Sequence, residues 1–190
     1  MTDSGSLGPV LKWAGGKRQI LAEIQEHVPH SFSAYHEPFL GGGAVLFSLR
    51  PDRSFVSDIN GELMNVYQVI KDDVESLIID LKKHRNEAKY FYRVRELDRN
   101  ASLYENMTPV EKASRIIFLN KTCYNGLFGV NKAGQFNTPF GHYKNPNIVN
   151  ERALRAVSRF FSLADIEISC IDFEEALEKA GEGSFVYLDP

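Results

Sequence analysis

The sequence predicts an α/β protein whose parallel sheet is interrupted by a helical insertion. Two short apolar segments, residues 35–39 and 55–57, each precede a turn and a helical pattern, and two more, residues 166–170 and 185–188, follow a long middle region. Strands that alternate with helices are typical of a parallel sheet. Because the middle region is mostly helical, we divide the chain into a sheet domain, residues 1–70 and 151–190, and an inserted subdomain, residues 71–150.

Capping residues indicate where several of these helices begin. Asn60 precedes an apolar stripe at helical spacing, and Thr108 followed by Glu111 has the spacing of a capping box. Asp72 followed by Glu75 repeats that spacing. We therefore expect helices to begin after each of these caps.

A run of three glycines, residues 41–43, follows the first predicted strand and precedes a helix that begins at Ala44. Glycine lets the backbone turn with positive φ and leaves no Cβ in the way of a ligand. The free N–H groups of the helix start favour an anionic ligand group, and Glu37 just before the turn is suited to an ammonium or a hydroxyl. An ordinary strand-to-helix turn remains the alternative, because the spacing is not Gly-x-Gly-x-x-Gly.

A second glycine turn, residues 15–16, precedes the helix expected over residues 20–28. Trp13 and Lys17 flank it, so the turn has a flat apolar ring and a cation beside it. These two residues are binding candidates, although a buried Trp and a surface Lys are the simpler interpretations.

Acidic residues follow the second and third predicted strands. Asp58 ends residues 55–58, about where a nucleoside-binding sheet has the carboxylate that accepts from a ribose hydroxyl. Asp172 and Phe173 follow the third strand and are expected at the same edge of the sheet. The alternative for Asp58 is that it helps to cap the next helix.

Composition indicates an ordinary globular chain. The 190 residues are 43% hydrophobic and 25% charged, with a net charge of −3, and no apolar run approaches the length of a membrane span. The two cysteines form no Cys-x-x-Cys pair and the five histidines have no ligand spacing, so we expect no metal site. We expect a cytoplasmic protein without membrane contact.

Residues 123–144, which we call the tongue, have a different character. They mix aromatic rings, amides and glycines with Lys132 and Lys144, and no Asp or Glu occurs between Lys112 and Asn150. A turn at residues 132–134 predicts a projecting two-stranded hairpin. Rings that stack on bases and cations that contact phosphates suit nucleic acid, whereas a bland glycine-rich loop is the alternative.

Four motifs in one order give the chain a family resemblance. They are Lys-Trp-Ala-Gly-Gly-Lys at residues 12–17, Glu-Pro-Phe-Leu-Gly-Gly-Gly at 37–43, Tyr-Asn-Gly-Leu at 124–127 and Asp-Pro at 189–190. Together they resemble the S-adenosylmethionine-dependent DNA adenine-N6 methyltransferases of the Dam type. The resemblance implies a Rossmann-like methyltransferase sheet with an inserted target-recognition subdomain, and methylation of adenine in duplex DNA at a GATC-like site.

The residue patterns above and the resemblance together give the expected site residues. The expected cofactor-binding residues are Trp13, Lys17, Glu37, Phe39, Gly41, Gly43, Asp58, Asp172, Phe173 and Asp189. The expected DNA-binding residues are Lys121, Tyr124, Asn125, Leu127, Lys132, Asn137 and Lys144. A cognate restriction endonuclease is a possible partner.

The expected catalytic groups are Asp189 and the carbonyl of Pro190. The N6 amine of adenine is a poor nucleophile, because its lone pair is delocalised into the ring. Two acceptors for its N–H groups orient that lone pair towards the methyl group. The base must first leave the duplex and stack on an aromatic ring.

The chain departs from the family pattern in two ways. Gly129 stands where the family usually has Arg, so we expect the tongue to bind DNA mainly through charge. The sequence also stops before the second Pro and the Tyr of the catalytic motif, so we expect half of the family sheet to be absent and activity to be poor.

Other functions fit the sequence less well. A cytosine-C5 methyltransferase needs a nucleophilic Cys after Pro, but Cys123 and Cys170 follow Thr122 and Ser169. A nicotinamide oxidoreductase explains the glycine turn but not the tongue. The serious alternative is a non-catalytic remnant that binds S-adenosylmethionine or DNA.

Overall fold

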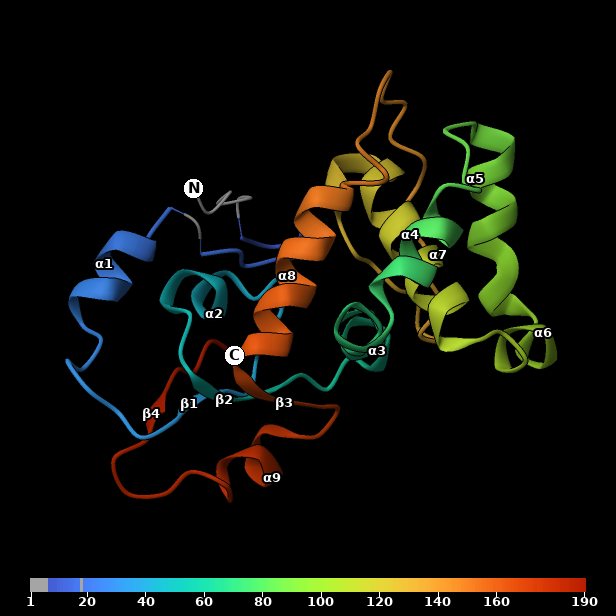
Figure 1. Ribbon diagram of the computed structural model, residues 1–190. Helices are drawn as coiled ribbons and strands as arrows, with labels where there is room; N and C mark the ends of the chain where they lie inside the picture. The colour runs from blue at the N-terminus through green and yellow to red at the C-terminus, as the bar shows by residue number, and fades with distance from the viewer. Residues whose placement is uncertain (1–6, 18) are drawn as a thin grey trace.

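A computed structural model of the chain describes residues 7–17 and 19–190, and it confirms the predicted α/β fold. Its central sheet has four parallel strands in the order β3-β2-β1-β4 (Figure 1). The strands are β1 (Tyr35–Glu37), β2 (Arg53–Ser57), β3 (Asp165–Ser169) and β4 (Phe185–Val186). β3 joins the sheet only after the long helical region, as the sequence predicts.

Helices account for most of the remaining regular structure. Those of the sheet region are α1 (Leu21–Glu26), α2 (Ala44–Leu49), α3 (Gly61–Asp72), α8 (Glu151–Leu163) and α9 (Phe173–Leu177). Those between α3 and α8 are α4 (Val74–Leu81), α5 (Ala88–Arg95), α6 (Ala101–Glu105) and α7 (Pro109–Thr122), with 3-10 turns η1 (Glu96–Arg99) and η2 (Tyr124–Gly126). Figure 1 shows α4–α7 gathered at one side of the sheet.

One face of the sheet packs on the main hydrophobic core. The parallel register aligns Tyr35 with Ser54 and Phe185, and Ser54 with Ile166, so these residues share a face. That face meets buried residues of α2, α3 and α8, and the same core continues into α4 and α7. The glycine turn after β1 is therefore fixed on a rigid layer.

A second core joins the tongue to α5 and α7. Phe91, Phe118, Phe136 and Phe140 are buried there against one another. The tongue is held by single antiparallel bridges, between Cys123 and Phe140 and between Val130 and Phe136, where the sequence predicts two strands.

The turn at the tip of the tongue agrees with the prediction. Gly134 has φ of 76°, the left-handed conformation that glycine adopts most easily. The Asn131 side chain accepts hydrogen bonds from Ala133 N and Gln135 N. These two side-chain hydrogen bonds stabilise the turn, because the tongue has little backbone pairing of its own.

The capping predictions have different outcomes. The capping box of Thr108 and Glu111 is present, and the Asn60 side chain accepts from Leu63 N at 3.1 Å. The predicted cap at Asp72 is wrong, because Asp72 lies inside α3, where it accepts from the Gln68 side chain.

Asp73 caps α4 instead, one residue beyond the expected position. β4 is shorter than its pattern predicts, because it pairs with β1 over only two residues where the apolar segment covers residues 185–188.

In the described part of the chain, no helix is both long enough and apolar enough to cross a membrane.

The first testable prediction concerns His84, which follows α4 and stacks on Phe118 at 4.4 Å while its ring nitrogens contact the Tyr90 hydroxyl and Ser114 Oγ. Burial lowers the pKa of His84 from 6.5 to about 4. Between these values the unfolded chain binds a proton that the folded chain excludes, so stability falls as pH falls through this window. We expect a loss of up to about 2 kcal/mol between pH 7 and pH 4.5, after allowance for partial exposure.

Urea unfolding at several pH values measures this effect. His84→Gln is the control, since it removes the titrating ring and should lose this share of the pH dependence. Equal pH dependence in the two proteins would contradict the prediction.

Candidate functional site

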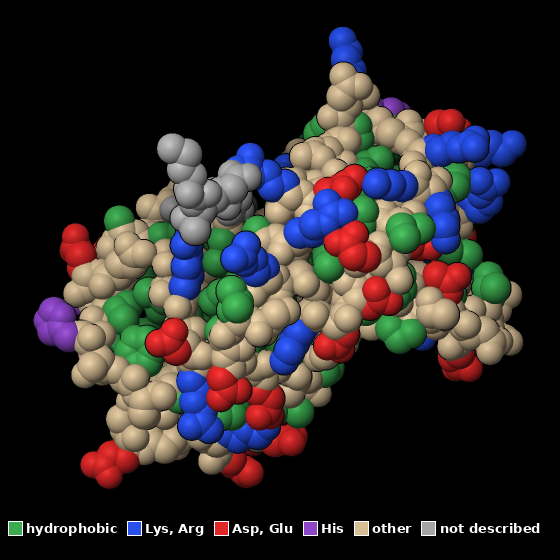
Figure 2. All heavy atoms as spheres, in the orientation of Figure 1, with side chains coloured by type: hydrophobic (Ala, Val, Ile, Leu, Met, Phe, Trp, Pro, Cys, Tyr) green, Lys and Arg blue, Asp and Glu red, His purple; other side chains and the backbone are tan. Residues whose placement is uncertain are grey.

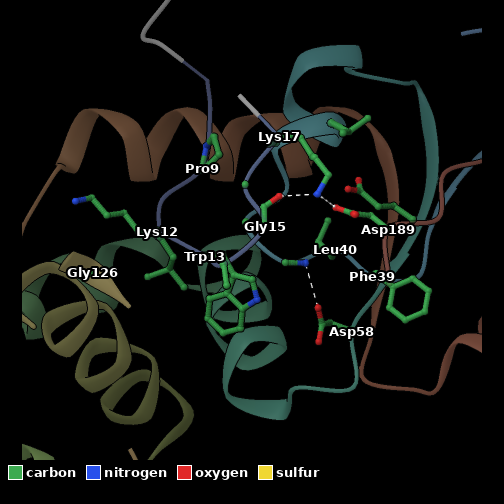
Figure 3. A pocket seen from close by; sticks show the side chains of 18 of the residues that line it. Pro9, Lys12, Trp13, Gly15, Lys17, Phe39, Leu40, Asp58, Gly126 and Asp189 are labelled. Carbon is green, nitrogen blue, oxygen red and sulfur yellow. Dashed lines mark hydrogen bonds and ion pairs between the residues drawn. The ribbon is translucent and has the colours of Figure 1, made fainter. Parts of the chain in front are cut away.

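A cavity of about 830 Å³ lies where β1 and β4 end, and five separate segments line it. They are residues 9–17 with the first glycine turn, residues 37–45 with the second, Asp58, residues 125–127 of the tongue, and residues 187–190. Figure 3 shows Trp13, Lys17 and Asp189 arranged around it. The cavity thus collects parts of all four motifs.

The turn at residues 41–43 needs glycine for space as well as for conformation. Gly41 has φ of 49°, and a Cβ there would lie 3.0 Å from Cδ1 of Trp13. Gly43, with φ of 68°, is the N-cap residue of α2, and a Cβ on it would strike the ring of Phe47. Gly43 itself does not line the cavity.

Asp58 fixes this turn to the end of β2. Its Oδ2 accepts from Gly41 N at 3.0 Å, and its Oδ1 accepts from Asn60 N at 2.9 Å (Figure 3). Asp58 therefore holds the turn and the start of α3 together. Its bond from Asn60 N agrees in part with the alternative that Asp58 helps to cap the next helix. It also lines the cavity.

Glu37 is a carboxyl group buried beneath the turn, with 3% of its surface exposed. The Tyr35 hydroxyl donates to its Oε2 at 2.9 Å. Burial, with a smaller contribution from the nearby Asp189, raises the pKa of Glu37 to about 8. A cation that reached this carboxyl would pair with it in a site of low dielectric constant, where ion pairing is strong.

Lys17 bridges the first glycine turn and the end of the chain. Its Nζ lies 2.5 Å from Oδ2 of Asp189 and donates to the Gly15 carbonyl at 2.7 Å (Figure 3). Both side chains are about one quarter to one third exposed, at 24% and 32%. One oxygen of Asp189 is thus held by a cation while the group still faces the cavity.

Aromatic rings form two stacked pairs at the site. Trp13 stacks on Phe128 of the tongue at 4.7 Å, and Phe39 stacks on Phe173 at 5.5 Å. Phe173 is not a lining residue of the cavity and reaches it only through Phe39. Asp172 also lies outside the lining, where it caps α9 through Glu174 N.

The root of the tongue forms one wall of the cavity. Asn125 and Leu127 line it, and Tyr124 beside them is 55% exposed. Asn125 has φ of 54°, an unusual conformation for a residue other than glycine. The predicted DNA-reading residues thus lie next to the predicted catalytic residues.

A second hollow of about 390 Å³ adjoins the first and shares Lys12 and Gly126 with it. Lys121 and Lys144 line this hollow. Figure 2 shows basic side chains over the helical region and on the loop that projects before α8. Lys132 is exposed within the tip turn of the tongue.

Part of the basic charge of residues 112–150 is buried inside the protein. Arg115 is 2% exposed, pairs with Asp98 at 2.6 Å and donates to the Val94 and Arg95 carbonyls. Asp98 in turn accepts from Phe136 N at 2.8 Å. Arg115 therefore holds the tongue in place and has no surface to offer to a polyanion.

Two further positions in the tongue are constrained by packing. A Cβ on Gly129 would lie 3.0 Å from Thr138 Oγ1 and 3.1 Å from Asn137 Oδ1, so a side chain there would displace both. Asn137 is exposed, and its backbone N–H donates to the Gly129 carbonyl at 2.9 Å.

From the sequence alone, no site role was assigned to Tyr187, Gly126 or Asn120. Tyr187 lines the cavity beside the catalytic motif. Asn120 is buried, and its side chain bonds the backbone of Lys12 and the Gly126 carbonyl. No local signal marks Asn120, because its partners lie 108 residues away in one direction and 6 in the other.

Comparison with known proteins identifies the family of the chain. Residues 13–190 match the family model described as D12 class N6 adenine-specific DNA methyltransferase. The chain is 41% identical over 187 residues to the type II methyltransferase M1.LlaDCHI of Lactococcus lactis subsp. cremoris, covering 97% of this chain and 66% of that protein.

Two other relatives cover a similar share. The chain is 44% identical to the type II methyltransferase M.MjaIII of Methanocaldococcus jannaschii, over 96% of this chain and 68% of the relative. It is 31% identical to a DNA adenine methylase of Escherichia coli (strain K12), over 95% of this chain and 63% of the relative. The chain spans about two thirds of the length of these relatives, and it belongs to the D12 class N6 adenine-specific DNA methyltransferase family.

Proposed function

We propose that this chain transfers a methyl group from S-adenosylmethionine to N6 of adenine in duplex DNA, within a GATC-like site. The observation that carries the proposal is a single cavity lined by both glycine turns, by Asp189 and Pro190, and by the root of the tongue. A methyl donor and an extruded base must meet in one space, and this cavity has contributions from the segments proposed for each.

The residues present fit such a donor. Gly41 and Gly42 line the cavity without side chains, so a ligand can approach the backbone of the turn. Glu37 is a buried acceptor for an ammonium group, and the ring of Phe39, which stacks on Phe173 behind it, offers a flat surface to a purine. Asp58 retains lone pairs for a ribose hydroxyl beyond those used for Gly41 and Asn60. When bound, the donor supplies an electrophilic methyl group.

Asp189 and Pro190 act on the acceptor base. Lys17 pairs with Asp189 and orients it, so the carboxylate accepts one N–H bond of the adenine amine while the Pro190 carbonyl accepts the other. These two acceptors direct the nitrogen lone pair and stabilise the positive charge that develops on it. Tyr124, exposed at the entrance, stacks on the extruded base or fills its place in the duplex.

The inserted subdomain, residues 71–150, serves as the DNA-reading part. Lys121 and Lys144 around the second hollow and Lys132 at the tip of the tongue contact phosphates, while Asn125, Leu127 and Asn137 face the bases. Two relatives carry the name type II methyltransferase, which supports a cognate restriction endonuclease as a partner.

Methyl transfer tests the proposal directly. We expect the protein to move labelled methyl groups from S-adenosylmethionine to an adenine-containing duplex, and Asp189→Asn to slow transfer by roughly 10²–10³-fold, the usual cost of losing a charge-stabilising group. Asp165→Asn is the matched control, since Asp165 is an exposed carboxylate on β3 that pairs with Arg53.

A protein that binds both ligands but transfers no methyl group would support the non-catalytic alternative. Equal rates for Asp189→Asn and the unaltered protein would remove Asp189 from the mechanism.

Glu37 predicts that donor affinity depends on pH. With a pKa of about 8, Glu37 is mostly protonated at pH 6.5 and must lose its proton to pair with an ammonium group. Affinity should therefore rise by up to about tenfold per pH unit between pH 6 and pH 7.5, with release of one proton. Calorimetry in buffers of different ionisation enthalpy measures both quantities.

Glu37→Gln should abolish the rise, whereas Glu105→Gln, at an exposed position on α6, should keep it. A flat profile in the unaltered protein would remove Glu37 from the ammonium site.

Charge on the tongue predicts the salt dependence of DNA binding. Lys132 and Lys144 are both exposed, so changing both to Gln should lower the slope of log K against log salt by about 2, one for each lost phosphate contact. Titration of a GATC duplex at several salt concentrations gives the slope. Lys179→Gln is the control, because Lys179 pairs with Glu167 on the sheet. An unchanged slope in the double variant would show that DNA lies elsewhere.

A further inference from the structure

Asn120, on the last turn of α7, uses its amide group on backbone partners from two segments, one of which lies 108 residues away in the sequence. Its Oδ1 accepts from Lys12 N at 2.9 Å, and its Nδ2 donates to the Lys12 carbonyl at 2.9 Å and to the Gly126 carbonyl at 3.0 Å. The side chain is 2% exposed. The amide therefore bonds the N–H and the carbonyl of Lys12, as a neighbouring strand would, and it also bonds the Gly126 carbonyl of the tongue.

The segments that Asn120 joins belong to the two halves of the site. Lys12 precedes Trp13, whose ring lies against the Gly41 turn in the donor cavity. Gly126 lies between Asn125 and Leu127, at the root of the tongue. Three hydrogen bonds from one buried amide fix the separation of these two walls.

The Gly126 backbone also lies close to the Lys12 side chain. Gly126 has φ of 67°, and a Cβ there would overlap the Lys12 side chain. Figure 3 shows Lys12 directed away from the cavity beside Gly126. The root of the tongue cannot shift without moving Lys12, and with it the Trp13 wall, because side chains that pack this tightly move together.

We propose that Asn120 is a positioning residue that couples the donor cavity to the tongue, so that occupation of one strengthens binding at the other. The inference rests on the proposed function, because it takes the two ligands to be an adenosyl compound and duplex DNA. A ligand that orders the Trp13 wall also orders the Gly126 turn through Asn120, and the second ligand then binds to a preformed site. Such coupling is reciprocal.

The experiment measures a thermodynamic cycle. The affinity for a GATC duplex is determined with and without saturating S-adenosylhomocysteine, which cannot transfer a methyl group, and the affinity for that compound is determined with and without the duplex. We expect about fivefold or greater mutual strengthening in the unaltered chain, the low end of typical coupling.

Asn120→Asp keeps the acceptor for Lys12 N but sets a carboxylate against two carbonyls that need donors. We expect the coupling to fall below about twofold, while the affinity for each ligand alone changes by less than about tenfold. Asn120→Ser removes the whole amide, and with it all three bonds, without adding charge; it is the second variant, measured if Asn120→Asp fails to fold. Gly126→Ala disturbs the contact between Gly126 and Lys12 and leaves the Asn120 amide intact, so we expect the same loss of coupling.

Thr122→Val is the matched control. Thr122 is also buried at the end of α7, but its hydroxyl bonds only the Phe118 carbonyl of its own helix. This variant should retain full coupling, which separates positioning from a general loss of stability.

The outcomes distinguish this inference from the proposed function. Coupling that persists in a folded Asn120 variant, or that is absent from an unaltered chain that binds both ligands and transfers methyl groups, overturns the inference alone. Failure of the unaltered chain to bind the adenosyl compound overturns the proposed function together with it.

Discussion

The hydrogen bond from Gly41 N to Asp58 is the constraint on which the site depends. Gly41 is also held through its carbonyl, which accepts from the Tyr67 hydroxyl of α3 at 3.0 Å, and Leu40 N before it donates to the Ser57 carbonyl at 2.9 Å. The turn is thus fixed from β2 and from α3, both of which rest on the main core. Because Trp13 lies against Gly41 and Glu37 lies beneath the turn, the cavity takes its shape from this one piece of backbone.

The tongue is held by a different interaction, a charge network that replaces strand pairing. Asp98 accepts from Phe136 N, and Arg99 donates to the Phe136 carbonyl at 2.7 Å, so two side chains satisfy the backbone of one residue. Arg115 compensates the buried charge of Asp98. Removal of one partner would leave the other charge buried and unpaired, which is costly. Arg99 and Arg115 therefore both hold the tongue, and Arg115 has almost no exposed surface.

Local signals in the sequence predicted those parts of the structure that local chemistry determines. The capping box at Thr108, the turn at Gly134 and the helix after residues 41–43 each depend on residues within four positions, and all are present. Long-range pairing could not be predicted. The burial of Arg115, the choice of Asp73 over Asp72 as a cap and the bonds from Asn120 to Lys12 depend on partners that only the folded chain brings together.

The charges around the cavity favour a cationic ligand. Its described lining includes three carboxyl groups, Glu37, Asp58 and Asp189, and two cations, of which Lys12 points away and Lys17 is already paired with Asp189. Burial keeps Glu37 largely protonated at neutral pH, so this carboxyl adds little negative charge to the cavity until a cation binds beside it. The proposed donor has a positive sulfonium and an ammonium group, which would supply that charge, and the loss of the sulfonium charge on methyl transfer would weaken the attraction. Under this proposal, the field that attracts the donor also favours release of the product.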